Sequence, residues 1–307
     1  MSRRVIALAL AVLMAILAAG CGAPKEEEAG HIEDQSDDTL RKTVVYYATE
    51  DGYIVPVMRK IQWQEGIGKA ALNLLVDNEK NRSDLASSGL IPTIPDTALD
   101  LNIKDGVAIV DIGDAAYACE DERAEANMVV SIVNTLCEFE TIKSVSIVSK
   151  GDTLERLKHG ASVAEPITYR DLNAESPPDE DTVAGLELYF GETGLLVPVT
   201  RYVSVQPDIK MAVEELIKGP DNEKLKLPFP KGTQVISAEL DKNGCAIINF
   251  SSEFAGIKHI EGAEERILKA LILTVGQFDG VTDMLVQVEG KTYVFSLPGA
   301  EIFANEY

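Results

Sequence analysis

A block of sequence that occurs twice constrains this chain more than any other feature. Residues 44–59 read VVYYATEDGYIVPVMR and residues 186–201 read LELYFGETGLLVPVTR, with seven identities in sixteen aligned positions. Two further pairs of blocks recur in the same order, residues 107–112 with 245–250 and residues 124–139 with 263–278. Chance is a poor explanation for three repeated blocks in one order, so the chain is a tandem duplication of one small module.

The duplication divides the chain into five parts. We expect a signal peptide over residues 1–20, an acidic tether over 21–40, a first module over 41–158, a linker over 159–183 and a second module over 184–307. The tether has almost no bulky apolar residue, so it cannot offset the entropy of ordering itself. The linker holds two adjacent prolines among four acidic residues, which predicts a stiff and solvated spacer.

The N-terminus indicates the compartment. The apolar run Val5–Leu17 has 13 residues after a short basic head, fewer than the ~20 of a membrane-spanning helix, which is typical of a signal peptide. Leu17-Ala18-Ala19-Gly20-Cys21 resembles the bacterial lipobox, although Ala18 stands where Leu is commonest. The resemblance implies that Cys21 is thioether-linked to diacylglycerol, which holds the mature chain on the extracytoplasmic face of the cell membrane. Ordinary cleavage beside an unrelated cysteine and twin-arginine export through Arg3-Arg4 are the alternatives.

Composition excludes several classes of partner. With 28 basic and 50 acidic residues the formal net charge is −22, which argues against nucleic acid and against electrostatic docking on anionic lipid. Apolar residues make up 46%, which is enough for a sizeable core and excludes wholesale disorder. Four cysteines in 307 residues are too few for a disulfide scaffold.

Hydrophobic periodicity gives each module the order β-β-α-β-β-α-β. Apolar residues at helical spacing predict the first helix over 67–75 in one repeat and over 209–217 in the other. Asp105-Gly106 and Asn243-Gly244 each predict a tight two-residue hairpin turn. The predicted fold class is α+β: two tandem small α/β sandwich modules, each with about five strands and with two helices on one face of the sheet.

Each module resembles the GerM domain of bacterial spore germination and sporulation lipoproteins. The resemblance rests on Val55-Pro56-Val57, on Gly89-Leu90-Ile91-Pro92 before the strand 107–111, and on Ser131–Leu136 followed by Phe139. It implies a fold akin to the ring-building modules of envelope channels, and a role near the channel that joins mother cell and forespore. GerM domains also occur in lipoproteins of envelope signalling, which is the alternative process.

The two repeats differ from each other at positions that belong to the GerM pattern. Repeat one has Val76-Asp77 where repeat two has Gly219-Pro220, and repeat two lacks the Gly-Leu before its proline loop. Repeat two also has Leu273 where repeat one has Asn134. A binding surface of one repeat can therefore be degraded in the other.

No pattern of residues in the sequence predicts catalysis. Asp111 and Asp114 follow a strand, but their counterparts are Asn249 and Ser252, so we interpret the acids as strand-end caps and not as an acid–base pair. The run Asp77–Asn81 lacks the glycine and the closing acid of a calcium loop. His259 is expected in an exposed loop. We therefore predict no enzyme activity, no cofactor and no metal, with a cell-wall hydrolase as the less favoured alternative.

The prediction is a lipid-anchored, non-catalytic docking module of sporulation or spore germination. Its expected partners are envelope proteins, in spore formers the channel complex. The residues predicted to bind a partner are Arg59 and Arg201 on the first hairpins, with Leu90 and Pro92 in the loop 87–95. The single tryptophan, Trp63, is expected to pack in the core with Tyr46, Tyr47 and Tyr53, and an interaction patch of these aromatic residues is the alternative.

Overall fold

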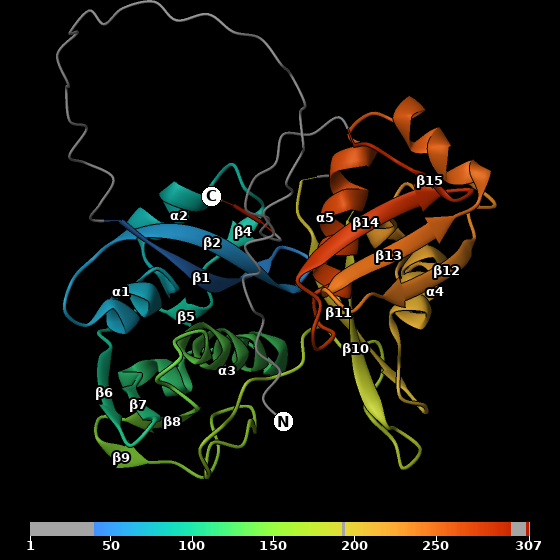
Figure 1. The fold of residues 1–307 in the computed structure, drawn as a ribbon. Helices are drawn as coiled ribbons and strands as arrows, with labels where there is room; N and C mark the ends of the chain where they lie inside the picture. Colours follow the sequence, from blue (N-terminus) through green and yellow to red (C-terminus); the bar gives the residue numbers. More distant parts are fainter. Residues whose placement is uncertain (1–39, 192–193, 296–304, 307) are drawn as a thin grey trace, which may run out of the picture.

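The computed structural model describes residues 40–191, 194–295 and 305–306. Cys21, the signal peptide and the tether up to residue 39 lie outside the described residues, so their predictions stay untested. Within the described ranges no helix combines the length and the apolar character that a membrane crossing needs. Figure 1 shows two bodies of helices and strands, the first blue to green and the second yellow to red.

The first module is built from a long hairpin, a second small sheet and a long helix. Its elements are β1 Leu40–Thr49, β2 Ile54–Gln62, α1 Ile67–Asn73, β3 Val76–Asp77, α2 Glu79–Leu85, β4 Leu90–Ile91, β5 Ile94–Pro95, β6 Asp100–Lys104, β7 Val107–Asp111, a 3-10 turn Gly113–Tyr117, α3 Glu122–Cys137, β8 Ser144–Ser149 and β9 Asp152–Thr153. The sheets have the strand orders β2-β1-β4, β6-β7-β8-β9 and β3-β5.

The second module repeats this plan in shorter form. Its elements are β10 Ala184–Phe190, β11 Val197–Val203, α4 Ile209–Lys218, a 3-10 turn Glu223–Leu225, β12 Val235–Leu240, β13 Cys245–Phe250, a 3-10 segment Ser252–His259, α5 Ala263–Val275, β14 Asp283–Val288 and β15 Lys291–Thr292. Its sheets have the orders β10-β11 and β12-β13-β14-β15.

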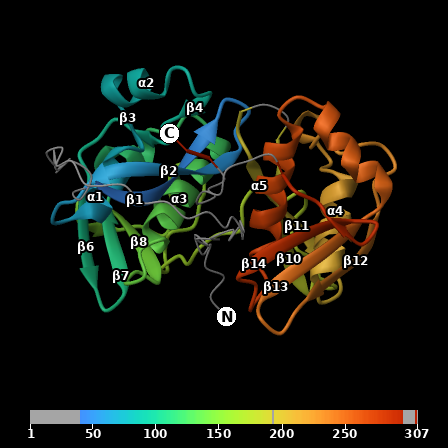
Figure 2. The same cartoon turned by 45° about the horizontal axis from the view of Figure 1, so that its top comes forward.

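The predicted α+β class with two tandem modules is confirmed, and the structure adds how the layers meet. In each module the strands form two separate main sheets, and the long helix packs on the hairpin: α3 contacts β1 and β8, and α5 contacts β10. Figure 2 shows α3 running past β1 in the first module and α5 beside α4 in the second. The strands before and after each long helix, β7 with β8 and β13 with β14, pair in parallel, because the helix carries the chain back across the sheet.

In both modules a buried threonine of the long helix accepts a hydrogen bond from the hairpin, although the donors Tyr46 and Tyr189 lie one position apart in the aligned repeats. The Tyr46 N–H donates to Thr135 Oγ1 at 3.0 Å, and the Tyr189 N–H donates to Thr274 Oγ1 at 3.4 Å. Both threonines are fully buried and occupy aligned positions in the repeated helix block. A buried strand N–H needs a partner, so the same polar residue serves the same purpose in both repeats.

The two predicted hairpin turns differ in geometry. Asp105 and Gly106 both have positive φ, 52° and 82°, as a tight two-residue turn between twisted strands requires. In the second module four residues, 241–244, lie between the end of β12 at Leu240 and the start of β13 at Cys245. Of these four residues only Gly244 has a positive φ. Asp241 Oδ1 accepts hydrogen bonds from the N–H groups of Asn243 and Cys245 and shapes this longer loop. The turn prediction is confirmed for repeat one and wrong in loop length for repeat two.

The segment predicted as a solvated linker is exposed in only part of its length. Residues 176–181 are exposed, but the preceding stretch packs on the first module. The buried Glu125 carboxylate accepts hydrogen bonds from the His159 and Ala161 N–H groups at 2.7 and 2.8 Å. Asn134 then bonds both backbone groups of Arg170, each at 2.9 Å. The two prolines and three of the four acids lie in the exposed part as predicted, whereas Glu175 is largely buried against Arg201. The packed part depends on contacts that the linker sequence does not reveal.

Candidate functional site

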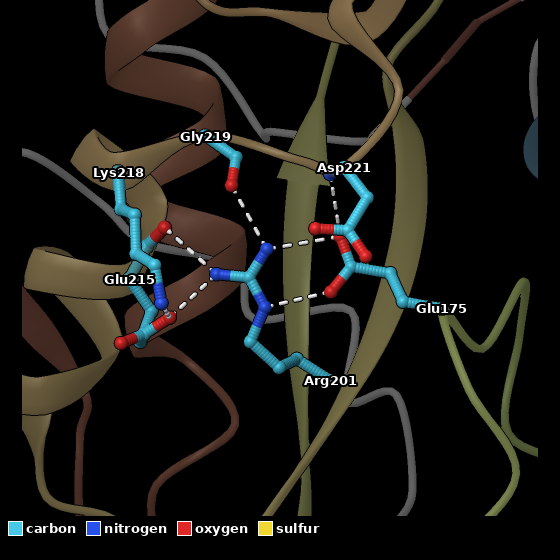
Figure 3. Close-up of polar contacts among 6 residues, drawn as sticks. All are labelled: Glu175, Arg201, Glu215, Lys218, Gly219 and Asp221. Carbon is cyan, nitrogen blue, oxygen red and sulfur yellow. Dashed lines mark hydrogen bonds and ion pairs between the residues drawn. The ribbon is translucent and has the colours of Figure 1, made fainter.

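Arg201, one of the residues predicted to bind a partner, is held by several groups of its own chain. Its guanidinium donates to both carboxylate oxygens of Glu175, with Nε–Oε2 at 2.7 Å and Nη2–Oε1 at 2.9 Å. Nη1 pairs with Glu215 Oε2 at 2.5 Å, and Nη2 donates to the Gly219 carbonyl at 2.8 Å. Figure 3 shows the guanidinium between the two carboxylates.

The low exposure of the side chains around Arg201 indicates that this cluster has a structural role. The side chain of Arg201 is 13% exposed and that of Glu175 is 12% exposed. Burial by itself raises the pKa of Glu175, but hydrogen bonds from Arg201 and from the Asp221 N–H outweigh it, so the pKa lies below its ordinary value. Since β11, the linker and the end of α4 all meet here, Arg201 joins the linker to the second module.

Arg59 occupies the aligned position in repeat one and makes different contacts. Its guanidinium carbon lies 5.8 Å from the centre of the Tyr47 ring, and Nη1 donates to Tyr47 Oη at 3.2 Å. The side chain is only partly buried at the end of β2. Glu175 and Glu215 pair with Arg201, so the two aligned arginines have different neighbours.

The loop that carries Leu90 and Pro92 has an inner and an outer face. Leu90 is 4% exposed and pairs with Thr49 at the edge of the hairpin, so it supports the loop from inside. Ile91 is 42% exposed, and Pro92 is partly exposed. The side chains that this loop presents outward are therefore Ile91 and Pro92.

A cluster of tyrosines and glutamates lies where the first module, the linker and the second module meet. Tyr46 Oη donates to Glu138 Oε1 at 2.5 Å and lies 3.0 Å from Tyr169 Oη, and the two rings meet edge to face. From β10, Tyr189 Oη donates to Glu187 Oε1 at 2.6 Å. Burial, followed by the charge of Glu187, raises the pKa of Glu138 to about 7, although the Tyr46 hydrogen bond opposes the shift. No local sequence pattern marks this cluster, because its members come from four separate segments.

The other residues singled out in the sequence serve local structure. Asp111 accepts hydrogen bonds from the N–H groups of Gly113, Lys150 and Gly151, which outweigh burial and hold its pKa below the ordinary value. Asp114 pairs with Lys150 at 2.6 Å on the surface. The cap interpretation is confirmed for Asp111. His259 is exposed at the end of its 3-10 segment, also as predicted.

The run that superficially resembles a calcium loop begins a helix. Asn78 is the N-cap of α2, and its side chain accepts a hydrogen bond from the Asn81 N–H at 2.9 Å. The buried Asn81 side chain donates to the carbonyls of Asn73 and Val76, both at 2.7 Å. Within the described ranges no group of three or more histidine, cysteine or acidic residues is placed to hold a metal ion.

The described cysteines are buried or half-buried thiols. Cys119, Cys137 and Cys245 are free, and none of the three forms a disulfide. Burial raises the pKa of Cys119 and of Cys137 to about 11, which keeps both in the less reactive thiol form.

Trp63 follows the end of β2 and is 59% exposed, so its predicted core position is wrong. The other aromatic residues of the first hairpin, Tyr46 and Tyr47, are buried and fill the core that Trp63 was expected to occupy.

These contacts define a protein of two repeated α+β modules whose buried polar groups form hydrogen bonds and ion pairs within the chain. The model of the Germane family, described as sporulation and spore germination, matches residues 44–155 and 187–294. The chain therefore belongs to the Germane family, with one family domain in each repeat. The resemblance predicted from the sequence is confirmed, and membership links the chain to sporulation or spore germination.

Solved structures agree with this fold. The tandem GerMN domains of the sporulation protein GerM from Bacillus subtilis match with a TM-score of 0.68 and 24% identity, covering 82% of this chain and 92% of that chain. The first GerMN domain of the same protein matches with a TM-score of 0.38 and 24% identity, covering 42% of this chain and 97% of that chain. The search among curated proteins gave no match.

Proposed function

We propose that the chain is a lipid-anchored, non-catalytic docking protein of the bacterial envelope that acts in sporulation or spore germination. Membership of both repeats in the Germane family supports the process. The observation that carries the docking role is that the two family modules contact each other directly, β2 beside β11. We infer that they act together at the end of the proposed tether.

The surface we propose for docking is on the first module. Ile91 and Pro92 lie outward in the loop between β4 and β5, and the buried Leu90 and Ile94 hold this loop in place. Arg59, stacked on Tyr47, adds a partly exposed positive charge on the same hairpin sheet. Exposed apolar and arginine side chains on a rigid support are typical of protein-binding hot spots.

Membrane attachment is the second part of the proposal. Leu17–Cys21 has the small residues and the cysteine of a lipobox, and two acyl chains are enough for stable anchoring. Replacing Cys21 with Ser should release the protein from the membrane fraction and abolish labelling by a radioactive fatty acid. Cys137→Ser is the matched control and should change neither. Labelling that survives in Cys21→Ser would overturn the anchor.

Crosslinking in the native host tests the docking role. We expect the anchored protein to capture channel-assembly proteins during sporulation, and Ile91→Asp to reduce that capture. Ile103→Asp is the control, because Ile103 is similarly exposed, at 47%, on the edge strand β6. Capture of a sensor kinase in growing cells would move the function to envelope signalling. Capture of no protein at all would overturn docking and direct attention to cell-wall assays.

A further inference from the structure

The contact between the two modules has an internal two-fold pattern. It is built on the starts of β2 and β11, which are aligned strands of the two repeats. Two asparagines bridge these strands, Asn173 from the segment after module one and Asn305 from the segment after module two. Figure 1 shows the red C-terminal residues among the blue strands of the first module.

The side chain of Asn305 forms hydrogen bonds with both modules, and both its oxygen and its nitrogen take part. Its Oδ1 accepts from the Leu196 N–H at 2.7 Å, and its Nδ2 donates to the Leu196 and Pro56 carbonyls, both at 2.9 Å. The residue is 6% exposed. A buried amide with every side-chain hydrogen-bonding group engaged is a specific contact, because each unmet bond would be costly.

Asn173 makes the same set of bonds with the modules exchanged. Its Oδ1 accepts from the Ile54 N–H at 2.9 Å, and its Nδ2 donates to the Ile54 carbonyl at 2.7 Å and the Pro198 carbonyl at 2.6 Å. Ile54 aligns with Leu196 and Pro56 aligns with Pro198 in the duplicated block. Exchanging the two repeats therefore exchanges the two asparagines and leaves the contacts the same.

The backbone of each tail also joins the strand of the other module. The Met58 N–H of module one donates to the Asn305 carbonyl at 2.8 Å. The aligned Thr200 N–H of module two donates to the Leu172 carbonyl at 2.9 Å, and the Glu175 N–H returns a bond to the Thr200 carbonyl at 3.1 Å. Each tail thus adds to β2 or β11 of the opposite module, as an added strand does in peptide recognition.

We propose that this face is a module-pairing surface whose partner is a second module of the same family, bound by exchange of asparagine-bearing tails. In this chain the duplication supplies the partner within one molecule. The reciprocal contacts are those of an isologous interface, in which one patch meets a copy of itself, so the chain has the organisation of a fused homodimer. It follows that modules from two copies of the chain can pair through the same face.

Cleavage of the folded chain tests whether the surface holds without the covalent connection. A recognition sequence for a site-specific protease is placed between Pro178 and Asp179, in the exposed part of the linker, of the detergent-solubilised full chain. After cleavage we expect the two halves to stay together on size-exclusion chromatography. Halves that separate at once would overturn the proposal.

Substitution of the two asparagines tests their role as the recognition element. Each of Asn173→Ala and Asn305→Ala should weaken the association of the cleaved halves on the order of 100-fold. Asn102→Ala, at an exposed position of β6, is the matched control and should leave it unchanged. Circular dichroism of the uncleaved variants is the check that both modules remain folded. If the cleaved halves that carry both Asn173→Ala and Asn305→Ala associate as strongly as those of wild type, the two asparagines are not the recognition element.

Mixing distinguishes a pairing surface from a merely internal contact. Cleaved chains with differently tagged halves are combined, and we expect hybrid pairs that carry one half from each chain. Failure to form hybrids over several dissociation times of the halves would overturn pairing between copies. These measurements use purified protein, so they are independent of whether an envelope partner is found.

Discussion

Arg59 and Arg201 stand at the same position of a duplicated hairpin and have different functions in the structure. Arg59 lies over one tyrosine ring at the surface, whereas Arg201 is buried between two carboxylates. The difference arises outside the hairpin: Glu175 comes from the linker and Glu215 from α4. A duplicated residue therefore keeps its backbone position but takes its function from neighbours that differ between the repeats, such as Glu215 on α4 and the aligned Asn73 on α1.

The largest expected effect is the loss of Arg201. Arg201→Ala leaves two partly buried carboxylates without their partner and should lower the free energy of unfolding by about 3–5 kcal/mol. Arg59→Ala removes the cation–π contact and the hydrogen bond with Tyr47, among the contacts of this half-buried side chain, and should cost less, about 1–2 kcal/mol. Urea unfolding of both variants, followed by circular dichroism, measures the difference.

Arg201→Lys refines this comparison. Lysine keeps the positive charge but cannot bond both oxygens of Glu175, so its cost should fall between those of wild type and Arg201→Ala. Equal destabilisation by Arg59→Ala and Arg201→Ala would show that the two arginines are equivalent after all.

Asn134 and Leu273 form the second pair that differs between the repeats. Asn134 is fully buried and bonds both backbone groups of Arg170, whereas the aligned Leu273 is partly buried apolar surface. Asn134→Leu, which introduces the residue of repeat two, should cost about 2–3 kcal/mol because the Arg170 backbone loses its partner. It should also speed proteolysis of the segment 159–175. The reverse exchange, Leu273→Asn, should leave that proteolysis unchanged, and accelerated cleavage in both variants would contradict the assignment.

Glu138 and the aligned Gln277 are the third pair that differs between the repeats. Because only Glu138 can ionise, this difference affects how stability depends on pH. Burial raises the pKa of Glu138 from 4.5 to about 7, so the folded state holds the proton more tightly than the unfolded state does. The resulting stability is fully present below pH 4.5 and is lost as the pH rises through 7.

Glu138→Gln makes repeat one resemble repeat two at this position and should remove that loss. Between pH 5.5 and pH 8 we expect the wild-type free energy of unfolding to fall by about 1–2 kcal/mol more than that of the variant. Glu140→Gln, at an exposed position two residues further on, is the control. Parallel pH profiles for wild type and Glu138→Gln would refute the assignment.

Much of the fold could be predicted from the sequence because it depends on local periodicity. The apolar spacing from Ile67 predicts the first helix, and positive φ at Asp105-Gly106 follows from the preference of Asp-Gly for a tight turn. The duplicated blocks gave two Germane domains, since a repeated pattern specifies a repeated fold.

The contacts between segments could not be predicted in the same way. Asn173 and Asn305 read as ordinary linker and tail residues, and only the meeting of β2 with β11 gives them their partners. The hydrogen bonds of Tyr46 with Glu138 and Tyr169 likewise join residues 92 and 123 positions apart, which no local pattern records. Tertiary contacts thus decide which polar residues matter here.

Trp63 and the aligned Val205 are similarly exposed. A substitution between these two residue types should therefore have the smallest effect on the free energy of unfolding. Trp63 is 59% exposed and Val205 is 54% exposed. Trp63→Val should therefore change the free energy of unfolding by less than about 0.5 kcal/mol. Because Trp63 is the single tryptophan of the chain, fluorescence reports on it alone, and iodide should quench the native protein nearly as well as the urea-unfolded chain. Strong protection from iodide would mean that the end of β2 is covered, by a partner module or by another part of the chain, and would break the parallel between the two hairpin ends.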